Sequence, residues 1–379
     1  MPPPSVRLSC HYAALFGVVG TTLPYWSLWL HDRGLEPVAI GLITGATVWG
    51  KLLVNPLAGL AADALGRPRW VMAVLALGSL TLYAGISWVE GVVGLLLMSL
   101  GAAGLCAALM PLSETLTLAQ ARAGTLDYGR VRLWGSLAFI VVSFALGPVL
   151  DRVGSEPVPW IILGFLALVL VGLPSLPSGP RHPRPAPGVW RHHLLAPRFL
   201  LFLLASGLIQ AGHATYYTFA TLHWRAAGLD GAFIGFLWAE GVAAEVALFF
   251  LGRRMVARLG PLGLLGLGAG AGVLRWTLSA FSTEPMVLMG AQVLHAGTFA
   301  CAHLGAMHFL SQTVPPALAN RAQALYSTLC QGVLMGAAMS MAGPVYQAWG
   351  GRAFLLDAGW CALGGLCVAG VAWGQRRGR

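Results

Sequence analysis

The chain has 379 residues, and only 9% of them are Asp, Glu, Lys or Arg, against roughly 25% in a soluble domain. Its mean hydropathy is +0.74. This composition excludes a soluble enzyme, a disordered tail protein and a disulfide-stapled secreted domain, because a soluble fold cannot bury so much apolar surface. It predicts an all-α polytopic membrane protein.

Twelve apolar runs are long enough to cross a bilayer as helices, which takes about 20 residues each. They lie at 10–30, 37–60, 70–89, 91–117, 130–150, 157–176, 198–222, 231–252, 261–281, 285–312, 320–345 and 353–374. Helices are expected because an open strand leaves backbone groups unpaired in lipid. The sequence therefore predicts twelve transmembrane helices, here called spans.

Basic residues orient these spans. With both termini in the cytoplasm, seventeen arginines fall on the inner side. Only four fall in outer loops, namely Arg33, Arg152, Arg225 and Arg352. Because basic loops stay inside, we expect a multi-pass protein of a bacterial inner membrane with both termini cytoplasmic. The net charge of +10 then reflects topology and requires no nucleic-acid partner.

The two halves of the chain repeat each other. Segments shifted by 194 residues match, and near the end of each half the shift is 196. The matching segments are 34–36 with 228–230, 65–66 with 259–260, and 147–149 with 343–345. Ordered matches at a nearly constant shift predict two six-helix repeats of parallel orientation, an architecture in which transporters bind substrate between the halves.

The domain boundaries follow from this repeat. We expect a six-helix bundle at 1–176, a cytoplasmic linker at 177–197 that is rich in Pro, Arg and His, and a second bundle at 198–379.

The loop at 59–69, GLAADALGRPR, resembles the signature loop of the major facilitator superfamily. The resemblance implies a cytoplasmic gate formed by this loop together with the start of the fifth span. The residues assigned to the gate are Gly59, Asp63, Gly66, Arg67, Arg69 and Arg130.

Further segments resemble phenylpropionate permease-like transporters, which are relatives of lactose permease in the same superfamily. These segments are 127–136, 241–245, 275–276, 294–299, 303–307 and 323–327. The resemblance implies the major facilitator fold and proton-coupled uptake of a small organic solute, with an aromatic carboxylate as one candidate. It also implies alternating access by a monomer without a cofactor.

Ionisable residues inside spans are costly in lipid and are therefore functional candidates. Lactose permease-like symporters couple protons through an arginine in helix nine and a histidine in helix ten, which Arg275 and His295 resemble. Proton coupling would then depend on Glu240 or Glu245. A structural ion pair between Glu240 and Arg275, estimated to lie at similar depth, is the alternative.

Three further charged residues are substrate-site candidates. Lys51 occupies the place equivalent to Glu245 at the 194-residue shift. It would attract a substrate carboxylate or close an inner gate, unless it extends to the lipid headgroups. Glu114 can reach Arg130 or Arg132, and lactose permease-like proteins hold sugar with such a pair. A gate salt bridge is the alternative.

Polar and aromatic residues share helix faces in spans one, seven and ten, as expected of a lined cavity for a small aromatic solute. The substrate-binding candidates among them are Tyr25, Trp26, Gln210, His213, Tyr217, Gln292 and His303. Trp29 and Trp224 are instead expected in the interfacial aromatic belt.

Other functions compete with proton-coupled uptake. A membrane enzyme is disfavoured, since no metalloprotease helix, nucleophile elbow or phosphate-binding loop is present, and no metal site is expected. A sensor with this fold is likewise disfavoured. Efflux of a drug or metabolite by proton antiport is the alternative within transport. Gly147-Pro148 fits the helix-five motif of such antiporters, but Asp151 and Arg152 replace the glycines expected after it.

Overall fold

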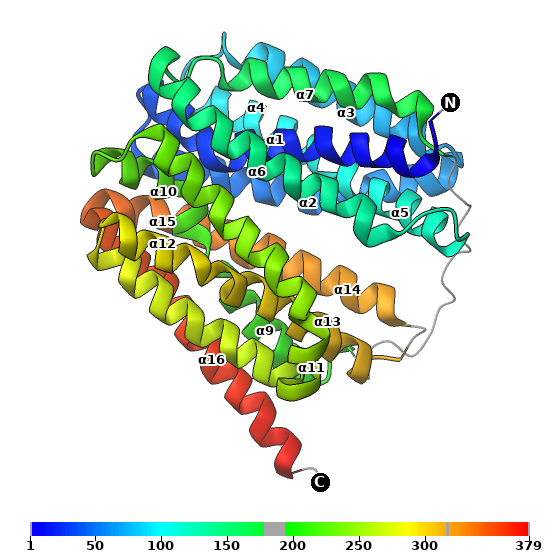
Figure 1. Ribbon diagram of the computed structural model, residues 1–379, viewed down its shortest axis with the longest axis vertical. Coiled ribbons are helices and arrows are strands. Elements are labelled where there is room, and N and C mark those ends of the chain that lie inside the picture. Colours follow the sequence, from blue (N-terminus) through cyan, green and yellow to red (C-terminus); the bar gives the residue numbers. More distant parts are fainter. Residues whose placement is uncertain (1, 178–193, 316–317, 378–379) are drawn as a thin grey trace. The chain divides into compact units, whose positions relative to one another are not determined.

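The computed structural model describes residues 2–177, 194–315 and 318–377, and every regular element within these ranges is a helix (Figure 1). The first half contains α1 (Pro4–Asp32), α2 (Pro37–Leu65), α3 (Pro68–Ile86), α4 (Val92–Ala107), α5 (Leu109–Arg122), α6 (Tyr128–Val153), α7 (Val158–Gly172) and η1 (Leu173–Ser175). The second half contains α9 (Pro197–Ala211), α10 (Ala214–Ala226), α11 (Gly231–Phe281), α12 (Pro285–Val293), η2 (Ala296–Cys301), α13 (Ala302–Thr313), α14 (Ala319–Tyr326), η4 (Ser327–Leu334), α15 (Met335–Trp349), η5 (Gly350–Ala353) and α16 (Phe354–Arg377).

The described helices confirm the expected spans. Eleven segments are long and apolar enough to cross a membrane, and the last of them, Arg321–Gly374, is 54 residues long. Gly350 breaks this segment at a φ of +54°, so α15 and α16 are separate crossings. Counted in this way, the described part of the chain has twelve spans.

The repeat seen in the sequence recurs in the backbone. Positive φ angles, which glycine adopts at little cost, occur in three glycine pairs at the expected shifts of 194, 194 and 196 residues. These pairs are Gly34 (81°) with Gly228 (84°), Gly66 (61°) with Gly260 (66°), and Gly154 (76°) with Gly350 (54°). The two halves therefore turn at equivalent places, as two six-helix repeats require.

The chain forms two compact units. Unit 1 lies within Met1–Pro185 and Gly228–Ala239, and unit 2 within Ala186–Ala227 and Glu240–Arg379. The start of α11 belongs to unit 1, where the Gly231 N–H donates to Asp151 and the Gly147 backbone touches Gly231. Most of the linker expected at 177–197 lies outside the described residues, and the domain boundaries given above stay a prediction.

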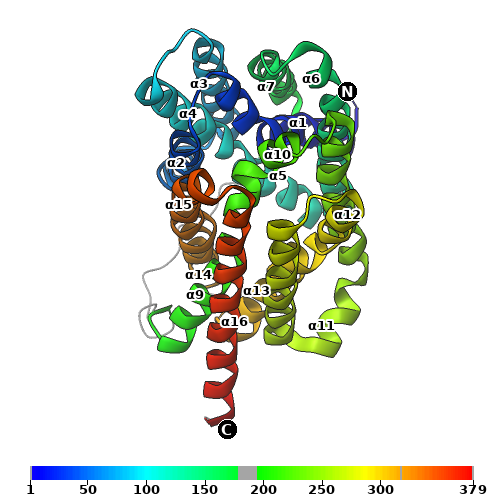
Figure 2. The same ribbon diagram turned by 90° about the vertical axis from the view of Figure 1, so that its left-hand side faces the viewer.

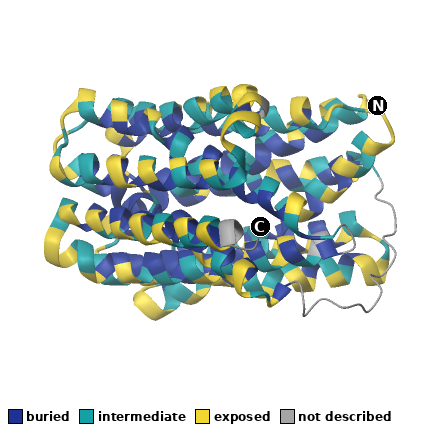
Figure 3. Ribbon diagram, turned by 90° about the horizontal axis from the view of Figure 1, so that it is seen from below, coloured by how far each residue is buried: buried dark blue, intermediate teal, exposed yellow. Residues whose placement is uncertain are grey.

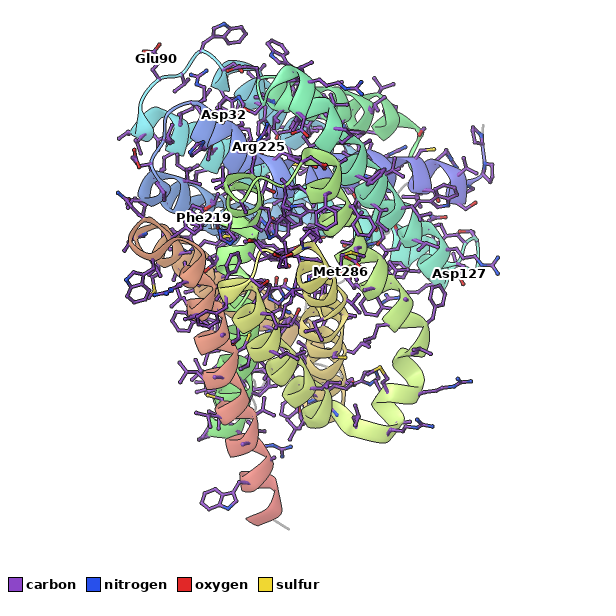
Figure 4. All side chains as sticks on the ribbon, turned by 60° about the vertical axis from the view of Figure 1, so that its left-hand side comes forward. Asp32, Glu90, Asp127, Phe219, Arg225 and Met286 are labelled. Atoms are coloured by element: carbon purple, nitrogen blue, oxygen red, sulfur yellow. The ribbon has the colours of Figure 1, made fainter. Side chains whose placement is uncertain are left out.

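In unit 1, α1 packs against α6 and α7, and α4 packs against α2 and α3 (Figure 1). Asp32 at the end of α1 and Glu90 before α4 lie at one end of the unit, whereas Asp127 at the start of α6 lies at the other (Figure 4). This placement agrees with the alternating inner and outer loops of the predicted topology.

In unit 2, α9 packs against α16 (Figure 2). It also packs against η4, and α10 packs against α15 and α16. Its apolar core includes a stack of rings, with Phe202 4.1 Å from Phe309 and 6.5 Å from Tyr326 between ring centroids. Three described spans of this unit are interrupted, one between α9 and α10, one at the π-helix η2 and one at the π-helix η4.

Exposed residues recur along the helices themselves and not only at their ends (Figure 3). Large apolar side chains are among them, including Leu53 at 69%, Val171 at 80% and Phe250 at 79% exposure. Apolar surface along the length of a helix suits a lipid environment.

Candidate functional site

Unit 2 contains a buried polar cluster formed by Arg275, Gln292, His295 and Thr298. Its centre is Arg275, which lies in α11 beyond the break at Gly260 and is fully buried. Its Nη1 donates to His295 Nδ1 at 2.8 Å and to Thr298 Oγ1 at 3.2 Å. Its Nη2 donates to Gln292 Oε1 at 2.7 Å. An imidazole, a hydroxyl and an amide are neutral acceptors, so none of these three bonds supplies a counter-charge.

Aromatic rings enclose the same guanidinium. Its Cζ lies 4.5 Å from the ring centroid of Tyr216 and 4.2 Å from that of Trp276, within the range of cation–π attraction. The Tyr216 hydroxyl donates to Gln292 Oε1 at 3.1 Å. Arg275 is therefore held both at its edge and through ring contacts.

The contact with Arg275 defines the tautomer of His295. Arginine has donors only, so His295 Nδ1 must accept, and the ring proton of the neutral imidazole then sits on Nε2. That Nε2 lies 3.7 Å from Glu245 Oε2. The buried cation thus makes His295 present an N–H to the Glu245 carboxylate, whose side chain is 18% exposed.

His213 has the opposite tautomer. Its Nδ1 lies 3.2 Å from the Gln210 carbonyl oxygen, which can only accept, so Nδ1 carries the proton. Its Nε2 then accepts from Thr298 Oγ1 at 3.0 Å. The rings of His213 and His295 lie 5.7 Å apart, and Tyr217 stacks on His213 at 5.4 Å.

Backbone irregularities position these side chains. His295 directly precedes η2, a π-helical segment of a kind that often occurs at functional sites. Gly241 in α11 allows close approach to α12 and to His295, because a Cβ there would lie 3.2 Å from Gln292 Oε1 and 3.5 Å from His295 Cδ2. The local sequence therefore favours a compact polar cluster at this depth of unit 2.

Asp357 was missed by the sequence analysis. It is fully buried at the start of α16, and its carboxylate caps the first turn of α10 through Thr215 and Tyr216. No sequence signal joins it to residues some 140 positions earlier.

Unit 1 holds a second charged cluster. Glu114 Oε1 accepts from Arg132 Nε at 3.1 Å, with the two side chains 25% and 30% exposed, and Tyr128 donates to the same carboxylate. The Arg132 guanidinium lies 4.2 Å from the Phe16 ring centroid. The structure thus joins Glu114 to Arg132, one of the two partners considered.

His11 and Ser113 were also missed in this unit. Their side chains are buried and form a hydrogen bond of 2.8 Å between Nε2 and Oγ.

The aromatic candidates of α1 are engaged within unit 1. The Tyr25 hydroxyl donates to the Ser143 carbonyl at 2.6 Å, and Trp26 packs on Trp29 at 4.8 Å and on Tyr83 at 5.5 Å.

The expectation that Trp29 and Trp224 form an interfacial belt is wrong, since they are 0% and 1% exposed. Each packs inside its own unit, Trp29 against Trp26 and Trp224 against Tyr216.

Other predicted residues lie apart from these contacts. Lys51 is exposed on α2.

Glu240 is partly buried, and its Oε2 has no hydrogen-bond partner among the described residues. Arg275 bonds to His295, Thr298 and Gln292 and makes no such bond to Glu240. His303 stacks on Phe299 at 6.2 Å.

The loop assigned to the cytoplasmic gate is partly engaged. Gly66 ends α2 in the left-handed conformation, and its N–H donates to the Ala62 carbonyl at 3.0 Å. Arg69 donates to the Leu176 carbonyl at 2.8 Å. Gly59 is half-buried and has open space beside it. The side chains of Asp63, Arg67 and Arg130 are exposed.

Comparison with known proteins identifies the family. The family described as "MFS_1 like family" matches residues 5–356. The chain belongs to this family. It is 32% identical over 353 residues to the "Probable 3-phenylpropionic acid transporter" of Escherichia coli, which covers 92% of each chain. It is 28% identical over 372 residues to the maltose permease of Geobacillus stearothermophilus, covering 94% of this chain and 91% of that one.

Solved structures agree on the fold. The crystal structure of the nucleoside transporter NupG matches with a TM-score of 0.83 at 16% identity, over 98% of each chain. This chain is thus a multi-pass membrane transporter of the major facilitator kind, and its family and relatives are transporters, not enzymes. Its resemblance to the phenylpropionate permease-like branch is confirmed.

Proposed function

We propose that this transporter takes up a small aromatic carboxylate together with protons, by alternating access. The similarity to a relative named for 3-phenylpropionic acid supports the substrate class. The cluster in unit 2 supports it as well, because aromatic rings surround a buried guanidinium there. An aromatic acid combines a flat apolar ring with one negative charge, and these groups complement both features.

The chain of contacts from Arg275 through His295 to Glu245 carries the proposal of proton coupling. Because Arg275 occupies Nδ1 at 2.8 Å, His295 stays neutral while that bond lasts. Of this pair, Glu245 is then the group that can take up a proton, and it is the more exposed, at 18% against 7% for the histidine. We assign the proton to Glu245.

Charge repulsion links proton and substrate in this proposal. Two carboxylates about 8 Å apart repel each other by about 2 kcal/mol at an effective dielectric constant of about 20. That energy corresponds to about thirtyfold in affinity. An ionised Glu245 therefore weakens binding of an anionic substrate, and protonation removes the penalty. Substrate and proton then bind and move together.

The remaining sequence predictions are part of the same proposal. In unit 1 the Glu114–Arg132 pair would contribute to substrate binding or to an inner gate, and Lys51 would attract a carboxylate. The arginine distribution supports an inner-membrane protein with both termini cytoplasmic.

Equilibrium binding of labelled 3-phenylpropionate to the purified protein, from about pH 5 to about pH 9, tests the assignment. Wild-type affinity should fall as pH rises, and Glu245→Gln, which mimics the protonated acid, should bind equally well throughout. Glu284→Gln, at an exposed acid of unit 2, is the matched control. Loss of the pH dependence in Glu240→Gln instead would assign the proton to Glu240.

A further inference from the structure

The seventh span is broken at Gly212 and His213, between α9 and α10. The first turn of a helix has N–H groups without intrahelical acceptors, and His213 provides no side-chain cap for α10. Asp357 of α16 supplies the acceptors. One carboxylate oxygen accepts from the Thr215 N–H at 3.1 Å and the Thr215 hydroxyl at 2.8 Å, and the other accepts from the Tyr216 N–H at 3.1 Å.

Glycines allow α16 to approach this break. A Cβ at Gly212 or Gly272 would overlap the Sγ of Cys361, which lies one turn after Asp357. A Cβ at Gly212 would also lie 3.0 Å from the Asp357 carbonyl oxygen. The seventh, ninth and twelfth spans therefore meet closely at this level of unit 2, and the contact of Asp357 with α10 is built into the packing.

The capped turn carries two side chains of the Arg275 cluster. The Tyr216 ring lies 4.5 Å from the guanidinium, and His213 Nε2 lies 3.0 Å from Thr298 Oγ1. Asp357 accepts three hydrogen bonds and is 0% exposed, as expected of a carboxylate fixed at the positive end of a helix.

In some transporters such a half-helix N-terminus binds the anionic group of the substrate. Here the protein's own carboxylate occupies this position.

We propose that Asp357 is a positioning residue for the Arg275 cluster. Its carboxylate orders the first turn of α10 and so places Tyr216 and His213 against Arg275 and η2. This inference rests on the proposed function, because the cluster is the proposed site of substrate and proton coupling. Because Asp357 already occupies the start of α10, the substrate carboxylate would have to bind at another place.

Amide hydrogen exchange of the full-length protein, combined with uptake of labelled 3-phenylpropionate into proteoliposomes, tests this role. Asp357→Asn removes the charge and one acceptor. It should speed exchange about tenfold at Thr215 and Tyr216, as expected for a lost cap, and also within η2. It should raise the KM for uptake about tenfold with less than about a twofold change in maximal rate, a split typical of lost ground-state binding.

Two further variants complete the experiment. Asp230→Asn is the matched control, because Asp230 caps the start of α11 in the same way, accepting from the Phe233 N–H at 2.7 Å. It should speed exchange only in the first turn of α11, where Phe233 lies, and not in α10 or η2. Thr215→Val removes a single donor to Asp357, so it should give a smaller change in the same direction. This variant still tests the proposal if Asp357→Asn does not fold.

The outcomes separate the two proposals. Faster exchange at α10 alone, or at neither place, would overturn the positioning role whatever the uptake. Faster exchange at both places with an unchanged KM would overturn it too. If the wild-type protein does not take up 3-phenylpropionate but exchange rises at both places, the proposed substrate is wrong and the positioning of the cluster by Asp357 stands.

Discussion

Replacing Gln292 with glutamate would place a carboxylate against the Arg275 guanidinium while keeping the shape of side chain 292. Gln292 Oε1 accepts from Arg275 at 2.7 Å and from Tyr216 at 3.1 Å, and a carboxylate accepts both bonds. The attraction gained is largely offset by the cost of burying the new charge. We therefore expect Gln292→Glu to fold, with a thermal midpoint within a few degrees of wild type.

Binding of an anion should change much more. The new carboxylate offsets the positive charge of Arg275, whose three hydrogen bonds go to neutral groups. A substrate anion about 8 Å away would lose about 2 kcal/mol of attraction at an effective dielectric constant of about 20. This loss corresponds to about thirtyfold weaker binding. A neutral ligand of the same shape should lose almost nothing.

Competition binding with 3-phenylpropionate and with its neutral amide measures this difference directly. Gln323→Glu, which adds the same charge at an exposed position of α14, is the control and should bind both ligands as the wild type does. If Gln292→Glu weakens both ligands equally, or neither, the charge of Arg275 does not attract the substrate and the reasoning fails.

Two other variants test packing and hydrogen bonding. Tyr25→Phe removes the hydroxyl that bonds to Ser143 at 2.6 Å. It should lower stability by about 1 kcal/mol, and an unchanged thermal midpoint would show that the bond contributes nothing. Gly241→Ala places a Cβ 3.2 Å from Gln292 Oε1 and should lower uptake about tenfold. Gly252→Ala, whose Cβ meets only the flexible end of Leu304 at 3.1 Å, should be tolerated; equal losses in both would refute the argument from Gly241.

The helices and the repeat could be predicted from the sequence because both depend on local or regularly spaced signals. Apolar runs of about 20 residues mark spans directly. The turns at Gly66 and Gly260 carry the same Leu-Gly pair, and both glycines have positive φ angles. Such features need no knowledge of which helices are neighbours.

The details of the site depend on contacts between distant parts of the chain. Thr215 and Asp357 are 142 residues apart, and their pairing follows from the packing of α10 on α16. Spacing along one helix predicts that His295 and Gln292 share a face. It does not predict which nitrogen of His295 faces Arg275. Trp29 shows the limit of position along a span as a guide. Because it lies near a span end, it was expected at the membrane interface, but it is buried.

Uptake of labelled 3-phenylpropionate into proteoliposomes, with and without an inward proton gradient, tests the central claim most directly. We predict that the wild-type protein accumulates the substrate only when the gradient is present. Glu245→Gln should fail to accumulate it but should still exchange internal for external substrate. Accumulation that ignores the gradient, or that requires an acidic interior as in antiport, would contradict proton-coupled uptake through Glu245.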